Sequence, residues 1–106
     1  MNGASARQYL TDEVAELLGA ASVGLYELLV ILSNSDTELD EDAKRAVARD
    51  VAADLVGRDE AQIYLLRWPR DNVIDGPLPV SVLDEPLTWG WLPSKLHFAL
   101  IKVRRV

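Results

Sequence analysis

The chain has 106 residues, of which 49% are apolar, so it is long and apolar enough to bury the core of one domain. It contains no cysteine and a single histidine, which excludes disulfides, thiolate metal sites and histidine-rich zinc sites. Of the net charge of −6, residues 1–56 carry eleven acids against four bases, whereas residues 57–106 carry six acids against seven bases. An acidic first half repels nucleic-acid phosphates and anionic lipid and attracts basic partners, although acidity also increases solubility on its own.

The first ten residues are mostly small and polar, and we expect residues 1–10 to form a flexible N-terminus ahead of a single domain over 11–106. This start lacks the basic-then-apolar order of a signal peptide. The most apolar stretch, 17–32, is too short and too interrupted by glycine, serine and Glu27 to cross a bilayer. We therefore expect a cytoplasmic protein that makes no contact with membranes.

Three helices are predicted in the first half. Apolar residues at helical spacing indicate a short helix over 12–18 and a second over 23–33, with Gly19 and Gly24 weakening the segment between them; one kinked helix is the alternative. The third helix, over 39–56, carries acids in its first turn and a row of small apolar residues, and Gly57 is placed to cap its end.

The second half changes to strand-forming residues. Strands are predicted over 61–68 and 96–103, with a loop over 70–76, a short strand or helical turn over 80–83, and a loop over 87–93. The predicted fold class is α+β, a three-helix bundle followed by a small antiparallel β-ribbon of two or three strands. Antiparallel pairing would bring Arg67, Arg70 and Lys95 to one tip of the ribbon and place Arg104 and Arg105 near its other end.

Catalytic chemistry is hard to assemble from these residues. His97 lies between Leu96 and Phe98, and we expect its side chain on the surface or at a rim. The acids Asp36, Glu38, Asp40 and Asp42 lack the glycine and the glutamate that a calcium loop requires at its sixth and twelfth positions. Glycine-rich phosphate-binding motifs are absent as well. We therefore expect no catalytic residue, no metal, no cofactor and no enzymatic activity.

A few short motifs resemble a loose group of small actinobacterial proteins that have winged-helix-like folds and unassigned functions. The motifs are Gly24-Leu25-Tyr26-Glu27-Leu28, Ile63-Tyr64, Trp68-Pro69, Leu83-Asp84 and the segment 89–93. They span about half of the chain and are not specific. The resemblance implies a winged-helix-like α+β domain. A DNA-binding transcriptional regulator is then the alternative function, but the helix that would enter the major groove carries five acids against three bases over 40–54, where DNA-reading helices are usually basic.

All three tryptophans and all five prolines lie between positions 68 and 93. Prolines break regular elements, and tryptophans are too apolar to be left in water without a role, so this segment is expected to be ordered and irregular. Its rings either close the core or contact a partner, because tryptophan is enriched in interface hot spots. The predicted function is a non-catalytic protein-interaction or regulatory module that binds another protein or a second copy of itself, with nucleic acid unlikely. The predicted protein-binding residues are Arg70, Trp89, Trp91 and Lys95.

Overall fold

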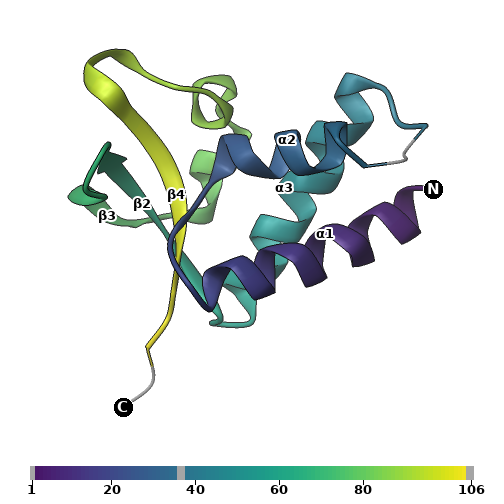
Figure 1. Ribbon diagram of the computed structural model, residues 1–106, viewed down its shortest axis with the longest axis horizontal. Coiled ribbons are helices and arrows are strands. Elements are labelled where there is room, and N and C mark those ends of the chain that lie inside the picture. Colours follow the sequence, from purple (N-terminus) through teal and green to yellow (C-terminus); the bar gives the residue numbers. More distant parts are fainter. Residues whose placement is uncertain (1, 36–37, 105–106) are drawn as a thin grey trace.

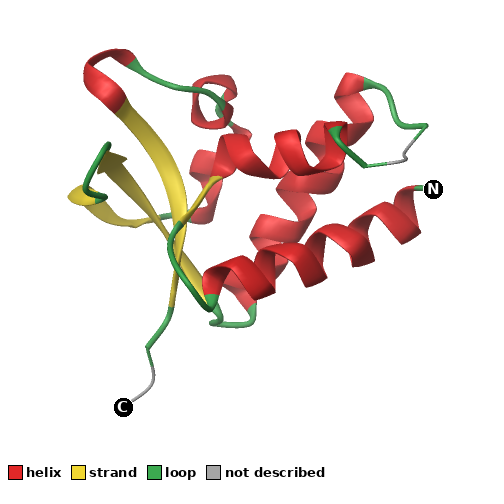
Figure 2. Cartoon of the chain, in the orientation of Figure 1, coloured by secondary structure: helices red, strands yellow, loops and turns green. Residues whose placement is uncertain are grey.

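Three helices and a four-stranded antiparallel sheet form the fold in the computed structural model, which describes residues 2–35 and 38–104 (Figures 1 and 2). The helices gather on one side of the sheet, and the predicted α+β class is confirmed. The helices are α1 (Gly3–Leu18), α2 (Leu25–Ser33) and α3 (Glu41–Gly57), and the strands are β1 (Val23–Gly24), β2 (Ala61–Arg67), β3 (Asn72–Leu78) and β4 (Leu96–Lys102). Three short 3-10 helices connect β3 to β4: η1 (Val80–Asp84), η2 (Pro86–Trp89) and η3 (Pro93–Lys95).

The N-terminal helix begins much earlier than expected. Asn2 caps α1 by accepting a hydrogen bond from the Ser5 backbone N–H at 2.9 Å. Residues 3–10, which we expected to lie in a flexible N-terminus, form its first turns instead. The reason is an i,i+4 row that extends upstream of the predicted start and is buried along its whole length: Ala6, Leu10, Val14 and Leu18.

The other two helices lie close to their predicted positions. Val23 and Gly24 were expected to open the second helix, but they pair with β4, so α2 begins at Leu25. The Glu27 carboxylate then accepts a hydrogen bond from the Gly24 N–H at 3.3 Å. Asp40 caps α3 through the Ala43 N–H at 2.8 Å, and the helix continues to position 57, one residue beyond the prediction.

The sheet has the strand order β1-β4-β2-β3, so it has four strands where two or three were expected, with β1 and β3 flanking the predicted pair of β2 and β4. We predicted a loop over 70–76 because Asp75-Gly76-Pro77 is typical of a turn. The segment Asn72–Leu78 forms an edge strand instead, where register shifts and a proline are tolerated. Gly76 is required there: its φ is +134°, and a Cβ at this position would lie 2.5 Å from Cδ1 of Tyr64.

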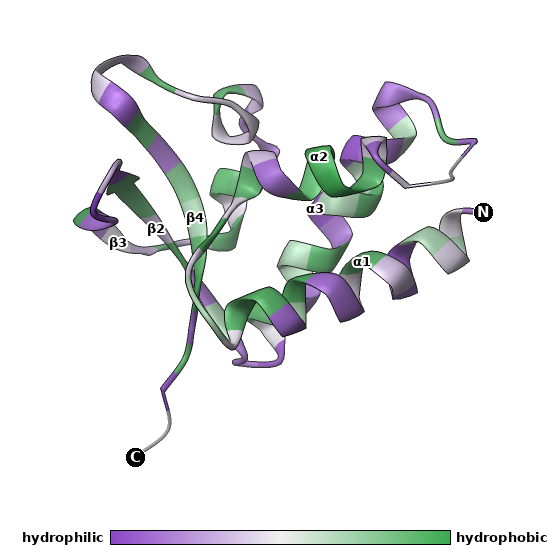
Figure 3. Cartoon of the chain, viewed as in Figure 1, coloured by the Kyte–Doolittle hydropathy of each residue, from purple (hydrophilic) through white to green (hydrophobic). Residues whose placement is uncertain are grey.

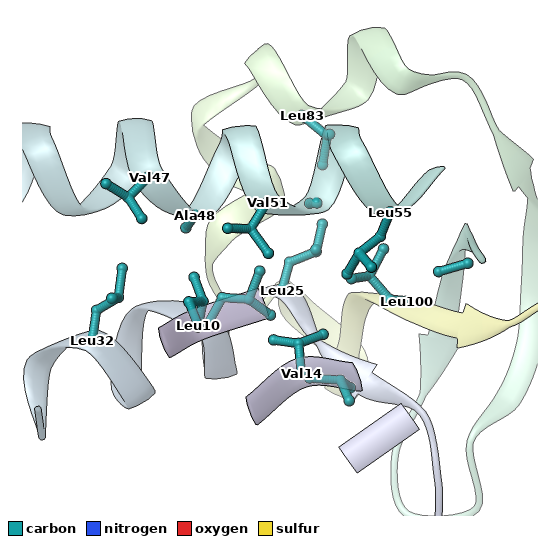
Figure 4. Close-up of a cluster of buried hydrophobic side chains, with 14 of the residues drawn as sticks. Leu10, Val14, Leu25, Leu32, Val47, Ala48, Val51, Leu55, Leu83 and Leu100 are labelled. Carbon is teal, nitrogen blue, oxygen red and sulfur yellow. The ribbon is translucent and has the colours of Figure 1, made fainter. Parts of the chain in front are cut away.

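The main core lies between the helices and the inner face of the sheet (Figure 4). Most of α2 is hydrophobic (Figure 3), and its residues Leu25, Leu28 and Leu32 are fully buried, although Val30 is 49% exposed. The sheet contributes Ile63 and Leu100, which lie opposite each other on β2 and β4. Each such side chain stabilises the fold by roughly 1.5–3 kcal/mol through burial. This core fixes the sheet against the helices and leaves its other face outward.

Candidate protein-interaction surface

The outer face of the sheet carries a second, smaller buried cluster. His97 on β4 lies directly opposite Leu66 on β2, and residues paired in this way project to the same face. Leu66 and Ala99 are completely buried, yet neither belongs to the main core, which lies on the face of Ile63 and Leu100. Buried residues therefore lie on both faces of the sheet.

Two aromatic rings cover His97 on this outer face. The Tyr26 and Trp91 ring centroids lie 5.9 Å and 4.6 Å from that of His97, and they lie 5.1 Å from each other. The expectation that His97 lies on the surface or at a rim is wrong, because its side chain is only 4% exposed. Within the described part of the chain its Nδ1 is buried and has no hydrogen-bond partner. Strand alternation placed His97 on the outer face, but nothing in the sequence predicted that rings from α2 and from a loop would cover it.

Trp68 and Lys95 lie at the end of the sheet where β2 finishes and β4 begins. The Trp68 backbone N–H donates a hydrogen bond to the Lys95 carbonyl at 3.0 Å, and the Lys95 ammonium lies 5.8 Å from the centroid of the Trp68 ring. Trp68 is 51% exposed and Trp91 is 47% exposed. Leu92, next to Trp91, donates its N–H to the Leu96 carbonyl at 2.8 Å, so Trp91 belongs to the same end of the sheet.

Two arginines complete this end. Arg67 pairs with Leu96 in the β2–β4 register, and Arg70 follows in the exposed turn before β3. The predicted gathering of Arg67, Arg70 and Lys95 is consistent with this pairing. Arg104 is exposed beyond the far end of β4, and Arg105 lies outside the described residues. We call the set at the near end the tryptophan tip, which consists of Arg67, Trp68, Arg70, Trp91 and Lys95.

Trp89 is not part of this surface, and its assignment as a contact residue is wrong. Its side chain is 5% exposed and belongs to the main core, where its indole N–H donates to the Leu83 carbonyl at 2.9 Å. The 3-10 helix η2 turns Trp89 inward, while Trp91, two residues later, packs on the outer face. Of the four predicted contact residues, Arg70, Trp91 and Lys95 are exposed.

The cations of the tip differ from those of α3. None of the three tip cations forms an ion pair with another described residue. On α3, by contrast, Lys44 pairs with Glu41 at 3.3 Å and Arg49 pairs with Asp84 at 2.7 Å. The Arg49 guanidinium donates to both Asp84 oxygens and holds the pKa of that carboxyl below its ordinary value.

Asp71 ties the outer face to the first half of the chain. Its carboxylate accepts a hydrogen bond from the Ser22 hydroxyl at 2.6 Å, which fixes the turn between β2 and β3 against the segment that leads into β1. Burial raises the pKa of the Tyr26 phenol, and the nearby Glu27 and Asp71 carboxylates raise it further. Tyr26 therefore ionises only at a pH above that of an ordinary tyrosine, and its uncharged ring packs on Trp91.

A shallow groove of about 250 Å³ lies elsewhere, between α3 and the segment that contains η1 and η2. Its lining mixes acids with bases, including Asp42, Arg45, Arg49 and Glu85. Over residues 2–35 and 38–104, no group of three or more histidine, aspartate or glutamate side chains is arranged to hold a metal ion. The groove therefore offers mixed charges without a converging set of ligands.

No protein-family model, curated protein or solved structure matches this chain. None of the described helices has the length and apolar character needed to span a membrane.

Proposed function

We propose that this chain is a non-catalytic protein-interaction module that contacts its partner through the tryptophan tip. The observation that carries the proposal is the pair of half-exposed tryptophans, Trp68 and Trp91, near the start of β4, where Trp68 bonds to the Lys95 backbone and Trp91 packs on His97. A tryptophan buries about 150–250 Å² in a typical core, so each of these rings leaves about 100 Å² of largely apolar surface in water. Clustered apolar surface of this kind marks interaction sites more often than isolated exposed residues do.

The tip is also preorganised for binding. Trp91 packs on Tyr26 and His97, so its indole is already ordered when a partner arrives, and the Lys95 ammonium lies 5.8 Å from the centroid of the Trp68 ring. Ordering a side chain at an interface costs roughly 0.5–1.5 kcal/mol, and a prepacked ring avoids most of that cost. Rigid tryptophans beside an arginine or lysine are typical of binding hot spots.

Affinity capture with matched variants tests the proposal. Tagged wild-type protein, a Trp68→Ala/Trp91→Ala variant and a Tyr9→Ala variant would each be exposed to lysate of the source organism, and recovered proteins identified by mass spectrometry. Tyr9 is the control, because it is an exposed aromatic residue, 36% accessible, that lies on α1 and does not belong to the tryptophan tip. We expect a small set of proteins that the wild type and Tyr9→Ala retain and the double variant loses, with direct binding then measured on the purified partner. Identical recovery by all three proteins would refute the proposal.

A winged-helix DNA-binding regulator is the second candidate, and the strand order favours it. The chain runs helix, strand, helix, helix, strand, with the short β1 between the first two helices pairing with the last strand. This is the order expected of a winged helix. The charges of α3 argue against DNA binding, because two of its three cations, Lys44 and Arg49, already pair with carboxylates. Submicromolar retention of duplex DNA in a gel-shift assay at about 150 mM salt would favour this candidate.

A further inference from the structure

From the charges around the tryptophans we infer that the partner presents an acidic segment with an apolar side chain at its centre. This inference rests on the proposed function and specifies the chemistry that the tryptophan tip would recognise. The apolar side chain would pack on Trp68 and Trp91, and the flanking carboxylates would pair with Arg67, Arg70 and Lys95.

The first support is the charge distribution. The chain holds 11 bases and 17 acids. The tip contributes three of the bases, and two acids lie beside it, Asp71 in the turn and Glu27 near Tyr26, so the local charge is +1. The remainder holds 8 bases and 15 acids, a charge of −7. The tip is therefore a small basic area on an acidic protein, and an acidic segment is attracted to this area and repelled by the rest of the surface.

The second support is that the charges of the tip are available. Asp71 is the nearest acid in the turn, and its carboxylate already accepts a hydrogen bond from Ser22. The exposed Arg67, Arg70 and Lys95 form no ion pair with the other described residues. The Lys95 ammonium lies beside the face of the Trp68 indole. Two neighbouring partner residues could therefore contact both groups at once, a carboxylate pairing with Lys95 and an apolar side chain packing on Trp68.

Two other occupants fit these charges less well. Nucleic acid would gain at most three phosphate contacts at the tip, while the remainder, with a charge of −7, repels its other phosphates; affinity for nucleic acid depends on the number of neutralised phosphates. A second copy also carries a net charge of −6, so long-range repulsion opposes self-association. An acidic protein segment needs only local contact with the tip and avoids the remaining surface.

Selection from a phage-displayed library of random linear peptides tests the inference with the full chain. The bait would be the immobilised wild-type protein, and the charge-reversed variant Arg70→Glu/Lys95→Glu would be compared with it. The matched control is Lys102→Glu/Arg104→Glu, which reverses two exposed cations at the opposite end of β4. Circular dichroism would establish that each variant is folded before selection.

We expect the wild type and the control to enrich acidic peptides that contain an aromatic or large aliphatic residue. The enriched peptide, once synthesised, should bind the Arg70→Glu/Lys95→Glu variant about tenfold or more weakly and the control variant nearly as well as the wild type. Its affinity for the wild type should fall when salt is raised, because exposed ion pairs are screened.

Five outcomes would overturn the inference. Neutral or basic peptides that still require Trp68 and Trp91 would refute the acidic partner but leave the proposed function intact. Enrichment that is unaffected by Trp68→Ala/Trp91→Ala, or no enrichment at all, would count against both. Binding of single-stranded oligothymidylate at about 150 mM salt that depends on Lys95 would indicate nucleic acid instead. Self-association in sedimentation velocity that Arg70→Glu/Lys95→Glu abolishes would indicate a second copy.

Discussion

Replacing Trp89 by alanine should destabilise this protein far more than the same replacement at Trp91, although only Gly90 separates the two residues. Trp89 is 5% exposed in the main core, and its indole N–H donates to the Leu83 carbonyl. Truncating a tryptophan in a core costs about 3–5 kcal/mol of unfolding free energy. The carbonyl that loses its buried donor places Trp89→Ala at the upper end of that range.

The smaller effect at Trp91 follows from its exposure. Its side chain is 47% accessible, so it buries only about 100 Å², which at about 25 cal/mol per Å² gives about 2.5 kcal/mol as an upper value. We therefore expect Trp91→Ala to cost about 1–2.5 kcal/mol. Urea denaturation followed by far-UV circular dichroism would measure both variants, because this signal does not depend on tryptophan fluorescence.

A Trp89→Phe variant separates ring burial from the hydrogen bond. Phenylalanine keeps most of the apolar volume but leaves the Leu83 carbonyl without its donor, which should cost about 1–3 kcal/mol. Equal losses for Trp89→Ala and Trp91→Ala would refute the division of the two tryptophans between core and surface. A larger loss of unfolding free energy for Trp91→Ala would indicate that Trp91, and not Trp89, is the core residue.

Three further predictions concern the fold. Leu10→Ala should lower the free energy of unfolding, measured by urea denaturation, by about 2–5 kcal/mol, because α1 begins at Gly3 and Leu10 is fully buried. An effect near zero would indicate that the N-terminus is flexible, as the sequence predicted. Gly76→Ala should cost about 1–3 kcal/mol, since the φ at position 76 is +134°, whereas Gly90→Ala meets open space and should cost much less. Asp84→Asn should be less stable than the wild type at neutral pH. Because Arg49 lowers the pKa of Asp84 from its ordinary 3.8, the pair stabilises the fold above that value, and the difference should shrink as pH falls through the lowered pKa. A difference that persists at low pH in acid titrations would contradict this assignment.

The elements that could be predicted from the sequence are those with a strong local period. Helix α3 and strands β2 and β4 lie within a residue or two of their predicted bounds, because a row of alanines and valines or a run of β-branched and aromatic residues specifies them locally. Pairing of these strands brought Arg67 and Lys95 together, as the antiparallel arrangement implied. Three of the four candidate contact residues, Arg70, Trp91 and Lys95, are exposed.

The features that were missed depend on contacts between distant segments. Val23 and Gly24 form a strand only because Leu100 and Ala99 lie beside them. The strand over 72–78 contains turn residues that an edge position tolerates. Likewise, whether a tryptophan two residues from another points inward depends on how the 3-10 helix before it packs. Local sequence carries none of this information.

The last of the described strands, β4, lies inside the sheet, between β1 and β2. Until it emerges, the two-residue β1 has no neighbour, β2 lacks a partner on one side, and the inner sheet face is incomplete. A nascent or truncated chain without residues 96–102 would thus expose backbone edges and apolar side chains together, a combination that promotes aggregation. Production of this protein should consequently be sensitive to premature termination before β4 is complete.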